Sequence, residues 1–490
     1  MIKKFNRTIL FFIYLPALIL LINIQQVNAV TRAEFLTGLL SARGIDWSEA
    51  PEFINGNAPG FMLRVGYVTE AVKNLNANIT RREALRWTIE SLGLGFEAGL
   101  FADYPTGFKD EKKLIPFERG CLVVALNMVP AIFSKADNFR GQNPLSSKEF
   151  QIILERVREA SQNFSLDIVR NPLKGLKVFI HREGVPTGIP QWRVYLDGIK
   201  TKVAADTFKK SLKAQGLTVS VTRSENLYGV RSERLENYNQ VRQLTAIAKA
   251  RGLTHRILPS MTNINTSILP KFWVKLVIDP SYFKIKPLIS KNDSKELLKL
   301  SELARQEKTK TAINAGFFSV TDPGRGYPIG ALKINDELIS QPYDNRGTLA
   351  WNNEDEAIFS VAYESEINSW YDMENIIQAG PLLLDEGGIS YIDEGFNNAL
   401  IATRHPRSVI GLSESGEWIF FVMDGRNGLH SSGATISELI EILRAQGVYS
   451  ALNLDGGGST EIIINGKIYN FPSDGRERKI SYGLGAFGLD

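Results

Sequence analysis

The chain has 490 residues and a formal net charge of +4, from 57 Lys and Arg against 53 Asp and Glu. This small positive excess, without basic runs, argues against a nucleic-acid-binding protein, and the ordinary apolar content indicates roughly two to four globular domains. The single cysteine, Cys121, excludes an internal disulfide framework and a Cys-based zinc site. Its apolar neighbours at 122–125 predict a buried structural thiol.

Residues 1–29 have the pattern of a secretory signal peptide. Basic residues lie within 3–7, an apolar core spans 9–24, and the small-residue site Val27-Asn-Ala29 is suited to cleavage. We therefore expect a secreted protein of the cell envelope, located in the wall, the S-layer or the periplasm, with no membrane contact after cleavage. The alternative is an uncleaved membrane anchor, since the apolar core is long for a signal.

A helix-start signal recurs between residues 30 and 165. Thr31-Arg-Ala-Glu34 and Thr80-Arg-Arg-Glu83 each place a capping Thr three residues before a Glu and ahead of an apolar run, and Ser146-Ser-Lys-Glu149 is a weaker third copy. Recurrence of one helix start indicates an internal repeat. The alternative is a bundle of ordinary capped helices.

These motifs resemble S-layer homology repeats, a family of α-helical repeats that hold bacterial surface proteins on cell-wall polysaccharide. The resemblance covers about residues 30–160 and implies that Arg32 and Arg81 bind the wall polymer. Ser147 stands where the third repeat would carry its arginine, so the resemblance implies an incomplete third site.

Residues 191–260 alternate regularly between strand and helix patterns. Apolar runs at 192–196, 217–221, 227–230 and 253–258 predict strands, and amphipathic stretches at 202–212 and 238–250 predict helices. The resulting βαββαβ order predicts a ferredoxin-like α+β module. It resembles a SPOR domain, a family that binds the glycan strands of peptidoglycan. The proline-containing segment 171–190 is expected to be the linker before it, so that linker and module together span 171–260.

Glycine-rich turns between short strands characterise residues 265–490. Several predicted strands end in glycine beside a polar side chain, which is where α/β proteins often build sites. The chain's most unusual stretch is Asn453-Leu-Asp-Gly-Gly-Gly-Ser-Thr460, because packing does not call for three successive glycines between Asp455 and Ser459. Consecutive glycines allow main-chain N–H groups to form an anion-binding nest. The alternative is a loose glycine hairpin.

Five motifs of this region occur in a characteristic order: N-A-G-F-F (314–318), Q-A-G-P-L-L (378–383), H-P-R-S (405–408), D-G-R (424–426) and L-N-L-D-G-G-G-S-T (452–460). Together they resemble the phosphodiester glycosidase family. The resemblance implies an α/β catalytic domain with a mixed sheet that hydrolyses a sugar 1-phosphodiester at the glycosidic bond. The sequence does not identify the sugar or the aglycone.

The chemistry of that reaction suggests a role for each polar residue. The leaving phosphate needs charge stabilisation, for which the planar guanidinium of Arg is suited, so Arg407 and Arg426 are assigned to it. A carboxylate, Asp424 or Asp455, serves as nucleophile or as base for water, and His405 is a candidate proton shuttle. The remaining candidate substrate ligands are Asn314, Gly316, Gly456, Gly457, Gly458, Ser459 and Arg478.

Two other functions fit parts of the sequence. The chain could be a non-catalytic protein that binds wall polysaccharide or peptidoglycan, although Asp424, Arg426, Asp455 and the three glycines are intact. It could instead be a metal-dependent phosphodiesterase, but no H-x-H or D-x-H pair with metal spacing is present. The preferred hypothesis therefore includes no metal and no cofactor.

Overall fold

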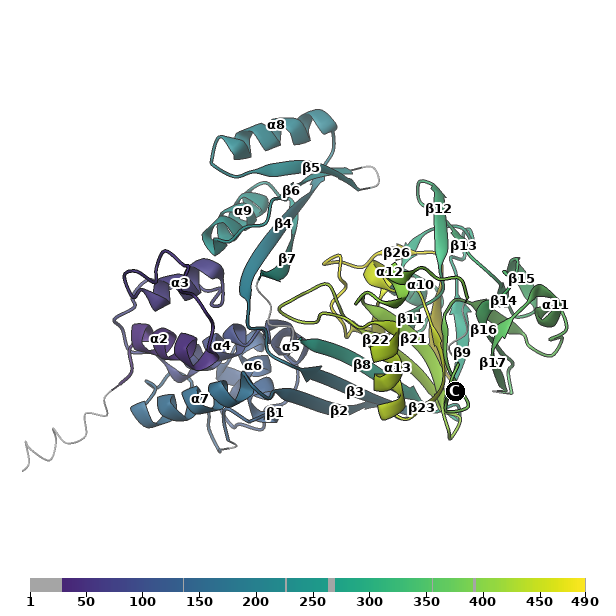
Figure 1. The fold of residues 1–490 in the computed structure, drawn as a ribbon, viewed down its shortest axis with the longest axis horizontal. Coiled ribbons are helices and arrows are strands. Elements are labelled where there is room, and N and C mark those ends of the chain that lie inside the picture. The colour runs from purple at the N-terminus through teal and green to yellow at the C-terminus, as the bar shows by residue number, and fades with distance from the viewer. Residues whose placement is uncertain are drawn as a thin grey trace, which may run out of the picture. The chain divides into compact units, whose positions relative to one another are not determined.

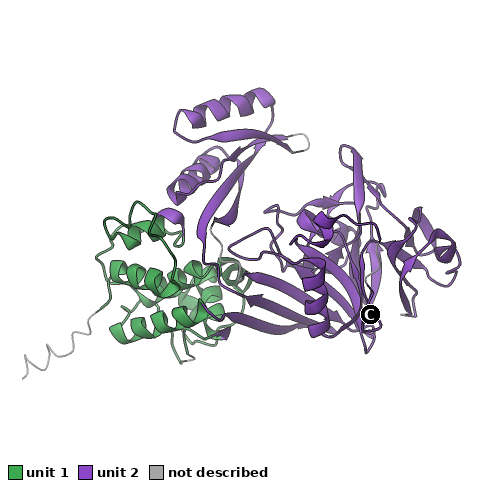
Figure 2. Cartoon of the chain, viewed as in Figure 1, with its two compact units in different colours: residues 1–63, 67–126, 130–161 green, residues 64–66, 127–129, 162–490 purple. Residues whose placement is uncertain are grey.

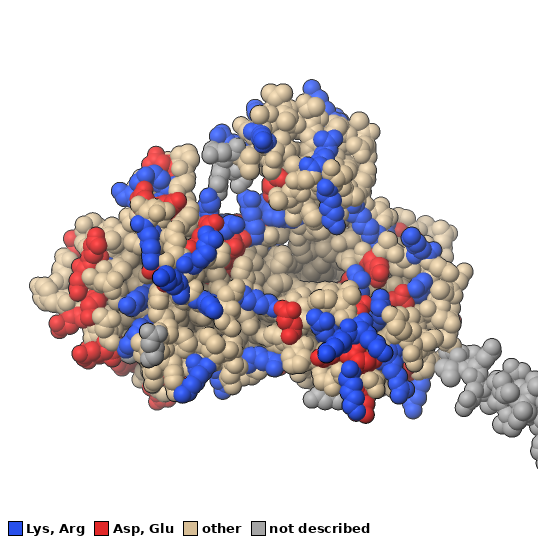
Figure 3. Space-filling model, turned by 180° about the vertical axis from the view of Figure 1, so that it is seen from behind, with Lys and Arg blue, Asp and Glu red and all other residues tan. Residues whose placement is uncertain are grey.

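The structure is a computed structural model that describes residues 29–134, 136–224, 227–262, 269–354, 356–390 and 394–489. Apart from Ala29, the expected signal peptide lies outside these residues. The described chain forms two compact units, a helical one of residues 29–63, 67–126 and 130–161 and a larger one of residues 64–66, 127–129 and 162–489 (Figure 2). None of the helices described is long and apolar enough to cross a membrane. Acidic and basic side chains both occur across the face seen in Figure 3.

The helical unit confirms the predicted helix starts. Thr31, Thr80 and Ser146 each cap a helix and form a complete capping box with the Glu three residues later. The buried thiol is also confirmed, since Cys121 lies in the core of this unit. The helices are α2 (Arg32–Arg43), α3 (Ala58–Val65), α4 (Arg81–Ser91), α5 (Gly95–Leu100), α6 (Pro116–Asn127) and α7 (Ser147–Ala160), with a 3-10 turn η1 (Glu111–Lys113).

Main-chain hydrogen bonds join the three capped segments into a closed ring. The amide of Val30 donates to the carbonyl of Leu145, Leu145 donates to Ile79, and Ile79 donates back to Val30. Equivalent positions of the three segments thus make equivalent bonds, and the internal repeat stays a prediction.

The arginines expected to bind a wall polymer connect successive capped helices. Arg32 forms an ion pair with Glu83, with 2.6 Å between Nη2 and Oε1, and Arg81 pairs in the same way with Glu149. Arg32 therefore binds the capping-box glutamate of α4, and Arg81 that of α7.

The segment expected to be a linker is instead part of a sheet. Residues 165–183 form a hairpin of β2 (Ser165–Leu173) and β3 (Leu176–Glu183), and β3 pairs with β8 (Lys271–Ile278) of the C-terminal domain. Alternate residues of β3 are buried, as expected for a strand with one face on a core. The linker prediction was wrong, because this segment is held in a sheet by pairing with β8, a strand distant from it in the sequence.

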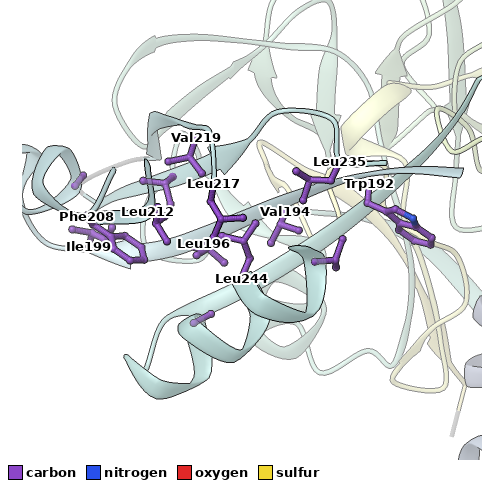
Figure 4. Packing of buried hydrophobic residues seen from close by; sticks show 14 of the residues in the cluster. Trp192, Val194, Leu196, Ile199, Phe208, Leu212, Leu217, Val219, Leu235 and Leu244 are labelled. Atoms are coloured by element: carbon purple, nitrogen blue, oxygen red, sulfur yellow. The ribbon is translucent and has the colours of Figure 1, made fainter. Parts of the chain in front are cut away.

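The ferredoxin-like module is confirmed as a fold. It consists of β4 (Ile189–Ile199), α8 (Lys202–Lys213), β5 (Val219–Ser224), β6 (Leu227–Ser232), α9 (Tyr238–Ala250) and β7 (Thr254–Thr262), in the sheet order β5-β6-β4-β7. Side chains from both helices and the sheet interdigitate in its core, among them Leu196, Phe208 and Leu244 (Figure 4).

A nine-stranded sheet forms the centre of the C-terminal domain (Figure 1). The helix α13 (Ile436–Ala445) covers it, burying Ile436, Leu439 and Leu443 against the strands. In order, the strands are β1 (Met128–Val129), β2, β3, β8, β22 (Trp418–Met423), β21 (Arg407–Ser413), β23 (Val448–Asn453), β19 (Leu382–Asp385) and β20 (Gly388–Ile389).

Two five-stranded sheets complete the domain. One runs β25 (Lys467–Ile468), β24 (Ile462–Ile464), β11 (Thr311–Asn314), β27 (Gly483–Gly488) and β9 (Phe283–Leu288). The other runs β15 (Glu337–Ser340), β14 (Leu332–Ile334), β18 (Asn375–Gln378), β16 (Arg346–Trp351) and β17 (Ala357–Ala362).

Smaller elements connect these sheets. They are β10 (Leu298–Lys299) with β26 (Lys479–Ile480), the hairpin β12 (Phe318–Asp322) and β13 (Arg325–Pro328), the helices α10 (Leu300–Gln306), α11 (Glu364–Ile367) and α12 (Asn398–Ile401), and a 3-10 turn η2 (Gly457–Ser459). The paired strands among the described residues are antiparallel, so the prediction of a mixed sheet was wrong.

Candidate active site

Three neighbouring strands bring the predicted site residues to one end of the central sheet. Arg407 begins β21, Asp424 follows β22, and Asp455 lies just beyond β23. The register pairs Arg407 with Met423 and Val409 with Asn453, so these strand ends are adjacent. The strands are buried along most of their length, which gives the polar groups a rigid support.

A cavity of about 310 Å³ opens at this end of the sheet, and we call it the catalytic pocket. Most of the predicted site residues line it: His405, Arg407, Arg426, Asp455, Gly456, Gly457, Gly458 and Arg478. Ser459 lines an adjoining cavity. The predicted residues Asn314, Gly316 and Asp424 line neither.

Asp455 is the carboxylate of the catalytic pocket. Desolvation in the pocket wall raises its pKa to about 6, although Ser459 and the guanidiniums of Arg478 and Arg426 act in the opposite direction. A carboxylate that titrates near neutrality and faces two cations can change its protonation state during a reaction, or can stay ionised beside a developing positive charge.

Two hydrogen bonds fix the main chain at Asp455. Its amide donates to the carbonyl of Ala315 at 2.9 Å, and Asn314 Nδ2 donates to its carbonyl at 2.7 Å. Asn314 Oδ1 accepts from Ser408 Oγ at 2.6 Å and from the Glu461 amide at 3.1 Å. Asn314 therefore positions the loop from behind the pocket, and its prediction as a sugar ligand is not supported by this geometry.

The glycines of the loop make room for neighbouring groups. A Cβ at Gly457 would lie 3.1 Å from the Arg426 guanidinium, and one at Gly458 would overlap the Arg478 guanidinium. The Gly457 amide donates to the Pro406 carbonyl at 3.1 Å, so it is not part of the predicted anion nest. The glycines therefore allow two guanidiniums to approach the main chain beside Asp455.

Arg426 is held in a strained and specific orientation. Its φ is +60°, a left-handed conformation that side chains other than glycine rarely adopt, and such strain is common at functional sites. Its Nη2 donates to His405 Nδ1 at 3.1 Å. Burial, followed by repulsion from Arg478, lowers the pKa of Arg426.

His405 orients Arg426. Its Nε2 donates to the Ala399 carbonyl at 2.9 Å, and Nδ1 accepts from Arg426, so both ring nitrogens are occupied in the neutral ring. Burial, together with Arg426 and Arg407, lowers the pKa of His405 and favours that neutral form. The predicted role as a proton shuttle is not supported by this arrangement.

The other two arginines of the pocket, Arg407 and Arg478, donate hydrogen bonds to different kinds of partner. Arg407 donates from Nε to Ala434 and from Nη2 to Leu400 and Thr403, in each case to a main-chain carbonyl. Burial lowers its pKa to about 10. Arg407 thus supports the pocket wall, and its assignment to the phosphate is replaced by a positioning role. Arg478 is exposed, and its Nε donates a hydrogen bond to Asp474 Oδ2 at 2.9 Å.

Asp424 is a buried structural carboxylate. Its oxygens accept from His430 Nε2 at 2.8 Å, from Asn470 Nδ2 at 2.9 Å and from the Phe471 amide at 2.7 Å. It is only 1% exposed. Of the two predicted carboxylates, Asp455 is therefore the one that can meet a substrate. Gly316 lies beside the Tyr482 hydroxyl, which a side chain there would displace.

Asn453 is a further residue of the site that was not predicted, although it belongs to the motif of Asp455. Asn453 lines the catalytic pocket and is 2% exposed. Its Nδ2 donates to the carbonyls of Gly380 and Leu454, at 2.7 and 3.0 Å, which fixes the amide orientation. Its Oδ1 has no hydrogen-bond partner among the described residues, so it is available to accept from a sugar hydroxyl.

The residues described do not include a group of three or more His, Cys, Asp or Glu side chains placed to hold a metal ion.

The raised pKa of Asp455 predicts the pH dependence of the reaction. If Asp455 acts as a carboxylate, kcat/KM is expected to rise with pH through about 6, and to fall about tenfold for each unit below that pH. The measurement is a pH–rate profile of kcat/KM from pH 4.5 to 8. A rate that decreases as the pH rises through this range would indicate that the protonated acid is the active form.

Part of this chain is similar to known proteins. Residues 307–487 match the family model described as phosphodiester glycosidase. The SPbeta prophage-derived uncharacterized protein YomE of Bacillus subtilis (strain 168) is 28% identical over 187 residues, which are 36% of this chain and 28% of the relative. The N-acetylglucosamine-1-phosphodiester alpha-N-acetylglucosaminidase of Mus musculus is 32% identical over 103 residues, which are 20% of either chain.

The chain thus spans about a fifth to about a quarter of the length of these two relatives. Among solved structures, the catalytic domain of the zebrafish N-acetylglucosamine-1-phosphodiester alpha-N-acetylglucosaminidase has a TM-score of 0.38 and 20% identity, over 45% of this chain and 78% of that one. By the family match, this chain contains a phosphodiester glycosidase domain at residues 307–487.

Proposed function

We propose that the C-terminal domain hydrolyses a sugar 1-phosphodiester at the bond between the anomeric carbon and the phosphate oxygen. The observation that carries this proposal is the placement of Asp455, a carboxylate with a pKa of about 6, beside the guanidiniums of Arg426 and Arg478. Two cations and one carboxylate match a substrate that has a phosphate next to a carbon that becomes positive in the transition state.

The leaving group explains why one carboxylate is enough. A phosphate monoester is a weak base, so it can leave with its electron pair without a strong general acid, provided that its charge is stabilised. The guanidiniums of Arg426 and Arg478 supply that stabilisation through the N–H donors that do not bind His405 and Asp474. Such preorganised charges are often the largest contribution to catalysis.

Asp455 stabilises the anomeric centre, as nucleophile or as base for water. In either case a water oxygen becomes bonded to the anomeric carbon, the bond from that carbon to the phosphate oxygen breaks, and a phosphate monoester leaves with the aglycone. The unpartnered Oδ1 of Asn453 accepts a hydroxyl of the sugar. N-acetylglucosamine, named for the mouse relative, is the first sugar to test.

The experiment incubates the purified full-length protein with the methyl phosphodiester of N-acetylglucosamine 1-phosphate and identifies both products by mass. We expect free N-acetylglucosamine and methyl phosphate. N-acetylglucosamine 1-phosphate and methanol would instead show cleavage on the other side of phosphorus, and loss of activity with EDTA would favour the metal-dependent alternative.

For the N-terminal region, the proposal is that residues 1–29 direct export and that the helical repeats hold the protein on cell-wall polysaccharide. A cavity of about 220 Å³ in the helical unit is lined by Arg82, Lys113 and Arg140, with Asp110 as the acidic residue among its described lining residues. This positive balance suits an anionic wall polymer. The ferredoxin-like module would be a second contact with glycan.

Removing positive charge tests whether the cavity of the helical unit binds a wall polymer. The double variant Lys113→Ala/Arg140→Ala is expected to reduce co-sedimentation with purified cell walls about tenfold, because it removes two of the three cations of the cavity. The control Lys148→Ala/Arg156→Ala removes the same charge from α7 outside the cavity. Equal retention of the two double variants would contradict the assignment.

A further inference from the structure

A second cavity, of about 770 Å³, adjoins the catalytic pocket, and we call it the side pocket. The two cavities share Phe317, Leu400, Asp455 and Arg478. A substrate bound at Asp455 and Arg478 can therefore extend from one cavity into the other without leaving the protein surface. The proposed hydrolysis makes no use of the side pocket.

The lining of the side pocket is mainly apolar. Its hydrophobic residues are Leu297, Phe317, Phe318, Val320, Ile329, Phe396 and Leu400. Val320 and Ile329 are 57% and 40% exposed, which is high for large aliphatic side chains at the wall of a cavity. A cavity lined mainly by apolar side chains, with a few polar groups, is typical of a ligand-binding site.

Positive charges border this apolar surface. Arg478 lines both cavities and Lys479 lines the side pocket. Arg346, which also lines it, has its Cζ 4.3 Å from the centroid of the Phe396 ring. The Nε of Arg346 is buried without a hydrogen-bond partner in the described part of the chain. Asp455 is the acidic residue among the described residues that line the cavity. The side pocket thus complements a hydrocarbon chain that carries an anionic head.

We propose that the side pocket binds a hydrocarbon aglycone, so that the substrate is a sugar 1-phosphate esterified to a long alkyl or prenyl-type chain. This inference rests on the proposed function. The sugar occupies the catalytic pocket at Asn453, and the phosphate lies at Arg426 and Arg478. The aglycone, attached to the other phosphate ester oxygen, continues over Phe317 into the side pocket.

The proposal predicts that chain length controls affinity even without catalysis. Binding of decyl phosphate and of methyl phosphate to the full-length protein is measured by titration calorimetry, below the micelle concentration of decyl phosphate. Each methylene that is buried contributes about fourfold to affinity. We therefore expect decyl phosphate to bind at least about tenfold more tightly than methyl phosphate.

Two variants show whether the side pocket causes that preference. Val320→Asn/Ile329→Asn changes exposed residues without adding charge, and is expected to remove most of the advantage of decyl phosphate while leaving methyl phosphate binding unchanged. Val203→Asn changes a valine that is 76% exposed on α8 and lies outside the side pocket, and should keep the advantage. Circular dichroism checks that both variants are folded.

The outcomes separate this inference from the proposed function. Equal binding of the two phosphates, or an unchanged advantage in the double variant, would overturn the side-pocket assignment. Hydrolysis of the decyl and methyl phosphodiesters of N-acetylglucosamine 1-phosphate is then compared. If decyl phosphate binds as expected and neither diester is hydrolysed, the pocket assignment is supported and the proposed hydrolysis is contradicted.

Discussion

Replacing Asp455 with Asn is expected to lower kcat by on the order of a hundredfold or more in a protein that remains folded. The amide has nearly the same shape as the carboxylate, but it cannot serve as nucleophile or base and carries no charge to stabilise the anomeric centre. The loop around it keeps its main-chain bonds to Ala315 and Asn314. The measurement is kcat on the methyl phosphodiester, with thermal unfolding as a check on the fold.

Asp424→Asn is the matched control for this prediction. Asp424 accepts hydrogen bonds from His430, Asn470 and Phe471 and lies outside the catalytic pocket. Its replacement is expected to lower the free energy of unfolding by about 1–3 kcal/mol, with a much smaller change in kcat of the folded fraction. Comparable kcat losses in the two variants at equal stability would contradict the assignment of Asp455 as the catalytic carboxylate.

Arg426→Lys is expected to lower kcat/KM by on the order of a hundredfold, although it keeps the positive charge. A lysine ammonium cannot form the paired donors of a guanidinium, and it cannot at the same time donate to His405 and reach a phosphate beside Gly457. The left-handed backbone at residue 426 is as strained for Lys as for Arg, so the comparison isolates the side chain.

Arg404→Lys is the control, because Arg404 pairs with Glu438 and does not line the catalytic pocket. It should leave kcat/KM within about threefold of the parent. If Arg426→Lys behaves like Arg404→Lys, the guanidinium of Arg426 does not contact the phosphate.

The parts of the fold that could be predicted depend on local signals. Each capping box is complete within four residues, so Thr31, Thr80 and Ser146 could be assigned from the sequence alone. The alternation of periods 2 and 3.6 in residues 191–260 likewise predicted the order of elements in the ferredoxin-like module. The hairpin at 165–183 was missed because its pairing with β8 is a contact between distant segments.

The site could be predicted as a set of residues, but their roles could not. The motifs identified Asp455, Arg426 and the glycine loop, which meet at the catalytic pocket. The same motifs contain Arg407, whose donors bind main-chain carbonyls that lie nearby only in the folded chain. Residue type and spacing do not indicate which polar group faces the cavity and which supports it.

The most direct test of the proposed reaction is the position of oxygen from solvent water. Hydrolysis of the methyl phosphodiester of N-acetylglucosamine 1-phosphate in ¹⁸O-labelled water, with both products analysed by mass spectrometry, shows which bond breaks. Attack at the anomeric carbon next to Asp455 predicts that the label appears on the sugar, with none on methyl phosphate. Label on the phosphate would mean attack at phosphorus and would contradict the glycosidase mechanism.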